Sequence, residues 1–404
     1  MAGRLDTSSA VRSPLLRKEL TLPGPVPEPA VAPAGACARF DPLAQSRRQA
    51  GADAPPFDLF LQGMVFLDII FTGLEAMPTG GREMWAEGMG SCPGGIANLA
   101  VAASRLGLRT SLGAAFGDDD YGEFCWRTLE QEGIDLSTSK RYPGWHSPVT
   151  VSIAVDGDRN MVTHGHEEPE CPSTMIGRPP RARAVLMDLS AHHPGETLGA
   201  QWADAAYEDG SLIFADVGWD PTGRWDVGVL EALTRCHAFM PNAGEAMAYT
   251  RTETPQDALY ALADRVPLAV VTNGPFGALA YDSTTGEEAA VPALKVPATD
   301  PTGAGDVFGA AVTLGTLAGW PLAHRLAFAA LCSSLAVQQV GGSLAAPGWG
   351  DIGDWWHALR DTQGGGTYLA SVRRRYAFME DLVPDQPYGV VHRAQATIAR
   401  MSDA

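Results

Sequence analysis

A turn of small residues stands directly before an apolar segment within residues 299–314, which read Thr-Asp-Pro-Thr-Gly-Ala-Gly-Asp-Val-Phe-Gly-Ala-Ala-Val-Thr-Leu. Apolar residues recur at helical spacing after Asp306, which predicts a helix that begins at or near Gly303. The small residues at 303–305 let a ligand approach the backbone amides. Free N–H groups and the positive end of the helix dipole favour an anion there. The stretch therefore predicts an anion site with an acid in the first helical turn.

Asp306 itself has two interpretations. Acids are common in the first turn of a helix because they complement the helix dipole, so its role could be purely structural. An acid beside an anion site also repels the anion, which suits a base that takes a proton from an attacking hydroxyl. Taken alone, the residue favours the structural interpretation.

The composition is that of a large folded chain with reduced thiols. Its 404 residues are 45% hydrophobic, and the formal net charge of −18 disfavours nucleic acid and anionic membranes as partners. The six cysteines are scattered without a Cys-x-x-Cys pair, which favours a cytoplasmic protein. The chain shows neither the apolar core of a secretory signal nor an apolar run of membrane-spanning length.

Three parts are expected along the chain. Residues 1–56 are rich in Ala, Pro, Arg and Ser without a sustained period, which predicts a disordered extension. From residue 183 onward short apolar runs alternate with helical segments, which indicates βαβ units and a mostly parallel sheet. An Asp-Gly turn at 156–157 between alternating runs predicts a hairpin. We expect one folded domain over residues 57–349 and a C-terminal extension over residues 350–404.

Two early segments carry candidate binding residues. Asp68 lies inside an apolar run, and a buried carboxylate needs partners such as sugar hydroxyls, although a solvated Asp at a strand end is an equal alternative. Gly94 and Gly95 precede a predicted helix and would let a ligand lie against the backbone. Asn98 offers both a donor and an acceptor. A glycine before a helix is commonplace, so this pattern alone is weak.

Two later turns follow predicted strands. Asn242 and Glu245 fit a helix N-cap with an acid in the first turn. Thr272 ends an apolar run, and Gly274 and Gly277 lie in the turn beyond it. Ligands of parallel sheets lie at the carboxyl ends of the strands, so both turns are candidates for binding. The alternative is that Asn242 and Glu245 only cap a helix and that Gly274 and Gly277 only form a turn.

Together these patterns resemble the PfkB-type, ribokinase-like sugar kinases. Residues 300–308 resemble the family's Asp-Thr-Thr-Gly-Ala-Gly-Asp-x-Phe signature, with Pro301 in place of the usual Thr. Residues 94–100 resemble its Gly-Gly-x-x-x-Asn-x-Ala signature, with two residues instead of three between Gly95 and Asn98, and residues 117–122 resemble its Gly-x-Asp-x-x-Gly turn. The turns at Asn242 and Thr272 resemble its Asn-x-x-Glu and Val-Thr-x-Gly-x-x-Gly motifs. The resemblance spans about residues 58–343, in the family's order.

The resemblance implies an α/β fold and a reaction. The expected fold is a ribokinase-like three-layer α/β/α domain with a mostly parallel central sheet and a small β-sheet lid, from about 72–92 and 147–166. The expected reaction is transfer of the γ-phosphoryl group of ATP to a sugar hydroxyl. Asp306 would be the general base, and the amides of Gly303, Ala304 and Gly305 would form the anion hole.

The resemblance also implies roles for the other motif residues. The sugar would be held by Asp68, Gly94, Gly95 and Asn98. The nucleotide would be bordered by Thr272, Gly274 and Gly277, and Mg²⁺ and phosphate by Asn242 and Glu245. A monovalent cation such as K⁺ would be bound by Asp300 and Thr302, between which Pro301 departs from the family pattern. A homodimer through the exposed edge of the lid is a further expectation.

Other functions are consistent with parts of the sequence. A nucleoside kinase of the same fold would use the same catalytic residues on a ribonucleoside. A non-catalytic, sugar-binding regulator is disfavoured because Asp306 and the glycines before it are present. An NAD-binding dehydrogenase is the weakest alternative, since Gly303 and Gly305 do not directly follow a strong apolar strand. Among sugars, an unphosphorylated acceptor is favoured because no Lys or Arg cluster lies in the matched sugar motifs.

Overall fold

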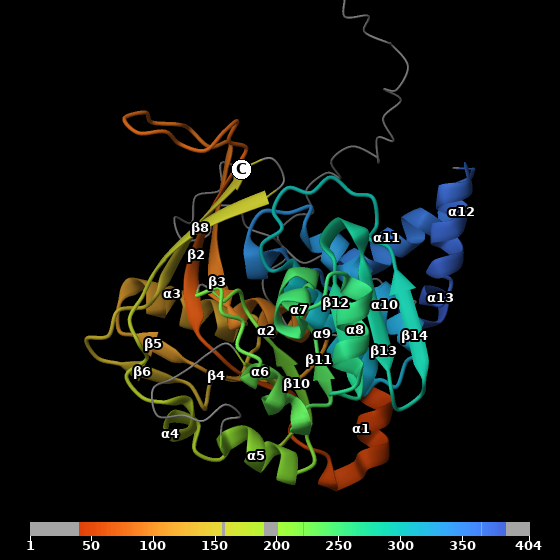
Figure 1. Ribbon diagram of the computed structural model, residues 1–404, viewed down its shortest axis with the longest axis horizontal. Coiled ribbons are helices and arrows are strands. Elements are labelled where there is room, and N and C mark those ends of the chain that lie inside the picture. The colour runs from red at the N-terminus through yellow and green to blue at the C-terminus, as the bar shows by residue number, and fades with distance from the viewer. Residues whose placement is uncertain (1–39, 156–157, 190–200, 221, 365, 385–404) are drawn as a thin grey trace, which may run out of the picture. The chain divides into compact units, whose positions relative to one another are not determined.

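The computed structural model in Figure 1 describes residues 40–155, 158–189, 201–220, 222–364 and 366–384. Its central element is an eight-stranded sheet with the order β14-β13-β12-β11-β10-β9-β1-β4. Neighbouring strands from β4 to β12 are parallel, and β13 and β14 join antiparallel at one edge. The strand bounds are β1 Phe57–Gln62, β4 Thr110–Gly113, β9 Ala182–Asp188, β10 Leu212–Asp216, β11 Ala238–Phe239, β12 Leu268–Thr272, β13 Ala278–Asp282 and β14 Glu287–Val291. The predicted mostly parallel sheet is confirmed.

Helices cover both faces of this sheet. Alternate residues of one strand enter different cores, as Leu59 and Leu61 belong to one and Phe60 to the other. The first core contains side chains of α2 Ile96–Arg105, α3 Asp120–Gln131, α9 Ala304–Leu317, α10 Leu322–Ala336, α11 Trp349–Asp361, α12 Gly366–Arg375 and α13 Met379–Leu382. The second contains side chains of α4 Pro172–Ile176, α5 Gln201–Glu208, α6 Gly228–Glu231, α7 Ala243–Thr250 and α8 Pro255–Ala263. The predicted three layers are therefore present.

A second sheet of four strands has the order β3-β2-β7-β8. Its strands are β2 Val65–Thr72, β3 Gly88–Gly95, β7 Val149–Val155 and β8 Asp158–His164. Only residues 63 and 64 separate β1 from β2, so the chain passes directly from the central sheet into this one. β7 and β8 pair antiparallel, as the predicted hairpin requires, and the Asp-Gly turn at 156–157 lies outside the described residues.

Short elements complete the described chain. β5 Ala115–Gly117 and β6 Lys140–Tyr142 form a separate parallel pair. Single 3₁₀ turns occur as η1 Gly51–Asp53, η2 Ala232–Arg235, η3 Gly274–Phe276 and η4 Gly342–Ala345. No described helix combines the length and the apolar character needed to cross a bilayer.

The segment from residue 40 to residue 56 differs from the predicted disordered extension. It contains helix α1, Ala44–Ala50, and the preceding Leu43 is only 1% exposed. Arg47 of this helix forms an ion pair with Asp58, whose fully buried carboxylate also accepts the backbone N–H of Arg109 at 2.8 Å. A buried carboxylate needs such donors, which explains why α1 docks here. Seven helical residues are too few for a periodic pattern to stand out, and residues 1–39 lie outside the described part.

The C-terminal extension expected over residues 350–404 continues the fold as far as residue 384. Trp349, Ile352 and Trp356 of α11 are at most 5% exposed and join the first core. Tyr376 and Met379 are fully buried in the same core. The indole N–H of Trp349 donates to the carbonyl of Leu106 at 2.9 Å, which ties α11 to the end of α2. Residues 385–404 lie outside the described part.

Candidate active site

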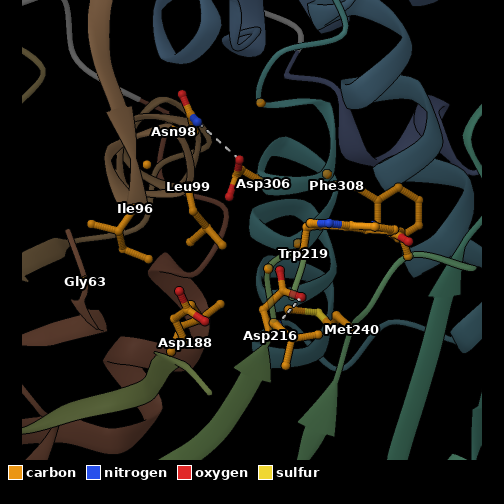
Figure 2. A pocket seen from close by; sticks show the side chains of 18 of the residues that line it. Gly63, Ile96, Asn98, Leu99, Asp188, Asp216, Trp219, Met240, Asp306 and Phe308 are labelled. Carbon is orange, nitrogen blue, oxygen red and sulfur yellow. Dashed lines mark hydrogen bonds between the residues drawn. The ribbon is translucent and has the colours of Figure 1, made fainter. Parts of the chain in front are cut away.

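A cavity of about 710 Å³ lies at the carboxyl ends of the central strands, where parallel sheets bind their ligands (Figure 2). β9 ends in Asp188 and β10 in Asp216, and both carboxylates line the cavity. Residues predicted from four separate motifs also line it: Gly95, Asn98, Asn242, Glu245, Thr272, Gly303, Gly305 and Asp306. The fold therefore brings together side chains that are up to 211 positions apart in the sequence.

Helix α9 begins as the sequence predicts. Its N-cap is Gly303, whose φ of 77° lies in the left-handed region that favours glycine. A Cβ at this position would lie 3.2 Å from Cγ of Asn98, so the small residue also lets α2 and α9 approach closely. Asp306 lies in the first turn of α9, and Figure 2 shows its carboxylate facing Asn98.

One predicted amide of the anion hole is already engaged. The backbone N–H of Ala304 donates to the carbonyl of Pro301 at 3.2 Å, within the turn that starts α9. The described part of the chain contains no such partner for the N–H groups of Gly303 and Gly305. These two amides are therefore better placed to meet an anion than the amide of Ala304.

Asn98 and Asp306 form a polar pair across the helix starts. Nδ2 of Asn98 donates to Oδ2 of Asp306 at 3.2 Å. Burial raises the pKa of Asp306 to about 6, although the hydrogen bond from Asn98 favours the charged form. Oδ1 of Asn98 is buried and accepts no hydrogen bond from the described residues. A buried acceptor of this kind is expected to find its partner in a ligand or water.

Asp68 lies beside the cavity rather than on its wall. It is on β2, opposite Cys92 of β3, and is 6% exposed. A Cβ on Gly94 would lie only 2.0 Å from Oδ2 of Asp68, so Gly94 leaves room for this carboxylate. Burial raises the pKa of Asp68 to about 7, and the negative charges of Asp306 and Asp300 add to the shift.

A second cavity, of about 300 Å³, adjoins the first. The two share Thr272, Gly305 and Phe308, so Gly305 stands at their junction. All three predicted nucleotide residues line the smaller cavity: Thr272, Gly274 and Gly277. Its other walls are largely apolar and include Leu294, Val296, Ala330 and Val337. The predicted nucleotide turn therefore lines a largely apolar cavity.

The predicted magnesium pair forms a reciprocal cap. Oδ1 of Asn242 accepts the N–H of Glu245 at 3.0 Å, and Oε2 of Glu245 accepts the N–H of Asn242 at 3.0 Å. Burial raises the pKa of Glu245. The pKa of Asp216 is raised well above its ordinary value by burial and by the charge of Glu245. No three ligating side chains of the described residues are arranged to hold a metal ion by themselves.

The predicted cation pair lies outside both cavities. Asp300 is 2% exposed and accepts the N–H of Thr302 at 2.9 Å and the N–H of Gly341 at 3.3 Å. It therefore fastens the turn before α9 to residue 341. The hydroxyl of Thr302 is buried and has no hydrogen-bond partner within the described chain.

Four of the lining residues that the sequence analysis missed carry a charge or an indole ring. They are Asp188, Asp216, Trp219 and Arg159. The two acids could have been found because each ends an apolar strand of a parallel sheet. Trp219 is 69% exposed and has its ring centroid 4.9 Å from that of Trp225. Arg159, on β8, is the sole Lys or Arg on this wall among the described residues, and only the folding of the second sheet over the cavity brings it there.

A family model described as "pfkB family carbohydrate kinase" matches residues 80–348. The chain belongs to the PfkB family of carbohydrate kinases. A ribokinase from Schizosaccharomyces pombe is 27% identical over 291 residues, which cover 67% of this chain and 89% of that protein. A nucleoside kinase from Methanothermobacter thermautotrophicus is 28% identical over 303 residues, which cover 73% and 94%.

A solved structure agrees with the fold of this PfkB-family chain. The Arabidopsis thaliana ribokinase complexed with ribose and ATP aligns with a TM-score of 0.59 and 24% identity, covering 73% of this chain and 96% of that one. The predicted ribokinase-like fold is therefore confirmed. As a PfkB-family kinase the protein is a phosphotransferase whose acceptor is a hydroxyl group of a sugar or nucleoside.

Proposed function

We propose that this PfkB-family kinase transfers the γ-phosphoryl group of ATP to a hydroxyl of an unphosphorylated sugar, with Asp306 as the general base. The observation that carries the proposal is the place of Asp306 in the first turn of α9, one residue beyond Gly305, at which the two cavities meet. An acceptor in the larger cavity and a nucleotide in the smaller one would meet at this point. In-line transfer requires such a meeting of acceptor and donor.

Asp306 would remove the proton of the attacking hydroxyl. A pKa of about 6 leaves it ionised at neutral pH yet basic enough to accept a proton. Asn98 would hold the carboxylate in place through Nδ2 while its free Oδ1 accepts a second sugar hydroxyl. The amides of Gly303 and Gly305, at the positive end of the α9 dipole, would stabilise the charge on the transferred group.

The character of the larger cavity supports a neutral acceptor. Arg159 is the one Lys or Arg among the described residues that line it. Four acids line it as well: Asp188, Asp216, Glu245 and Asp306. A phosphorylated or carboxylated sugar would meet one cation among these acids and would be repelled by those that are ionised. Gly95, on the cavity wall, would give the sugar access to the backbone, and Gly94 and Asp68 beside that wall would complete the sugar site.

The smaller cavity would take the adenine. Thr272, Gly274 and Gly277 would border it, with apolar side chains on the base. Mg²⁺ would neutralise part of the phosphate charge. Kinases bind this ion with one or two carboxylates together with phosphates and water. Glu245 fits that donor set, with Asn242 orienting it through the cap. A monovalent cation such as K⁺ would be held by the unpaired hydroxyl of Thr302 beside Asp300.

A nucleoside acceptor is the second candidate, and Trp219 favours it. An indole that lines the cavity with 69% of its surface exposed could stack on a base, and Trp225 supports it edge to face. Turnover of ATP against pentoses, ketohexoses, sugar phosphates and nucleosides separates the candidates. We expect the highest kcat/KM with an unphosphorylated sugar. A preference for a nucleoside would favour the second candidate, and a preference for a sugar phosphate would contradict both.

The proposed dimer would use the second sheet. β8 is an edge strand of this sheet, and Met161 and Val162 on it are 53% and 73% exposed. Apolar side chains on an exposed strand edge favour pairing with another strand. We propose a second copy of this chain as the partner, and the mass of the purified protein in solution tests this.

Asn98→Ala and Asp68→Ala are each expected to raise the KM for the acceptor and leave the KM for ATP nearly unchanged. Each removes hydrogen bonds to sugar hydroxyls worth about 1–3 kcal/mol, which corresponds to a roughly 5- to 150-fold change. Steady-state kinetics with each substrate varied in turn measures both constants. A rise in the KM for ATP with a constant acceptor KM would show that the two cavities are assigned the wrong way round.

The dependence of kcat/KM on pH should show the titration of the general base. Because a base must be deprotonated to act, kcat/KM is expected to fall as the pH drops through about 6, the raised pKa of Asp306. Asp68→Asn is a useful comparison, since burial raises the pKa of Asp68 to about 7 and the charge of Asp306 adds to that shift. The acidic limb should persist in this variant. Its disappearance would assign the titration to Asp68 instead.

A further inference from the structure

One wall of the smaller cavity has no secondary structure of its own. Residues 292–298 connect β14 to the turn before α9 in an irregular conformation. Leu294 and Val296 line the cavity, whereas Lys295 between them is exposed on the outside. The segment also packs closely against the nucleotide turn, because a Cβ on Gly277 would lie 2.7 Å from Cα of Pro292. The shape of the cavity therefore depends on what holds this segment.

Helix α12 supplies that support from outside. The hydroxyl of Tyr368 accepts the backbone N–H of Lys295 at 3.1 Å, and Nη1 of Arg375 donates to the carbonyl of Pro292 at 3.0 Å. The ammonium of Lys295 lies 5.2 Å from the centre of the Tyr368 ring. Within the described chain, the two hydrogen bonds to the main chain of residues 292–298 both come from this helix.

The distance between the two contacts is about the same along helix α12 as along the segment 292–298. Tyr368 and Arg375 are seven residues apart, which is about two helical turns, so they share one face of α12 at about 10 Å. Pro292 and Lys295 are three residues apart, and an extended chain spans about 10 Å over that length. One helix face therefore meets the segment at its start and at its middle, with the two chains running in opposite directions.

Helix α12 is itself fixed to the body of the fold. Val372 is 2% exposed and belongs to the first core. Arg373 donates to the carbonyl of Leu359 at 3.1 Å and to that of Gly364 at 3.1 Å, which ties α12 to the end of α11. The family model ends at residue 348, so this supporting helix lies beyond the matched kinase core.

We propose that Tyr368 and Arg375 are positioning residues that clamp residues 292–298 into the shape that receives the nucleobase. The clamp presents Leu294 and Val296 to the ligand before it binds, which lowers the ordering cost of binding. It touches neither the acceptor cavity nor Asp306, so it acts on nucleotide affinity and leaves the chemical step alone. The inference rests on the proposed function, which assigns the smaller cavity to ATP.

The double variant Tyr368→Ala/Arg375→Ala tests the clamp. We expect the Kd of ATP, measured by calorimetry without acceptor, and the KM for ATP to rise about five- to tenfold. The kcat and the acceptor KM should stay within about twofold. Arg374→Ala is the matched control, because Arg374 lies on the same helix and is exposed, and it should change none of these constants. Arg375→Lys, which keeps a donor for the Pro292 carbonyl, should recover part of the affinity lost in Arg375→Ala.

The outcomes separate the clamp from the proposed function. If the wild-type protein binds ATP and the double variant binds it equally well, the clamp is overturned and the kinase proposal stands. If kcat, acceptor KM and melting temperature all deteriorate along with the KM for ATP, α12 is merely structural and the clamp is again overturned. If the wild-type protein binds no ATP, both proposals fall together.

Discussion

Replacing Asp306 with Asn is expected to lower kcat on the order of 10²–10⁴-fold, the usual contribution of a positioned proton acceptor. The change preserves size and removes both the charge and the basicity. The affinity for ATP should hold or increase, because a carboxylate that repels the phosphates is gone. Measurement of kcat, the Kd of ATP and the melting temperature on one purified variant checks all three expectations.

A matched control distinguishes catalysis from a helix effect. Asp120 lies in the first turn of α3, is exposed and lines neither cavity. Asp120→Asn should therefore lose only the dipole contribution, about 0.3–1 kcal/mol of stability, with normal turnover. If Asp306→Asn behaves in the same way, Asp306 is a helix-capping acid and the proposed mechanism is wrong, whereas the family assignment is unaffected.

Asp58→Ala is expected to destabilise the fold by about 3–5 kcal/mol, the cost of removing one member of a buried ion pair. Asp58 is fully buried, and Arg47 and Arg109 both donate to its carboxylate. The variant leaves the guanidinium of Arg47, which is 13% exposed, with Asp41 as its remaining acidic partner, so the docking of α1 should weaken as well. Chemical denaturation measures the free energy of unfolding directly.

Truncation tests whether the folded domain includes α1, as the contact between Arg47 and Asp58 implies. Removal of residues 1–56 takes away α1 and should cost stability much as Asp58→Ala does. Asp53→Ala is the control, since Asp53 is exposed in η1, and it should change stability by no more than about 0.5 kcal/mol. Equal stability of the full chain and the form lacking residues 1–56 would show that α1 is dispensable.

The contact between Arg47 and Asp58 should also make the stability of the fold depend on pH. Burial opposes ionisation of Asp58, but hydrogen bonds from Arg47 and Arg109 prevail and hold its pKa below the ordinary value. A depressed pKa contributes stability above the ordinary value of the unfolded chain, and that contribution is lost as the pH falls through the folded value. The stability difference between wild type and Asp58→Asn should therefore shrink in acid.

The sequence by itself determined the features that depend on neighbours along the chain. The turn at residues 303–305 and the helix after it follow from small residues and apolar spacing, which act locally. The alternation of strands and helices predicted the parallel sheet for the same reason. The turns at Asn242 and Thr272 were placed by the strands before them, and both line the cavities at the predicted edge of the sheet.

The tertiary structure alone decided which side chains from distant segments meet. Arg159 reaches the cavity because the second sheet folds over it, and Asp68 stays behind the wall although it is near in sequence to Phe66, which lines it. The pairing of Arg47 with Asp58 and of α12 with residues 292–298 also joins elements with no common local pattern. Burial and long-range contact set these outcomes, and a pattern of period 2 or 3.6 carries information only about the element in which it occurs.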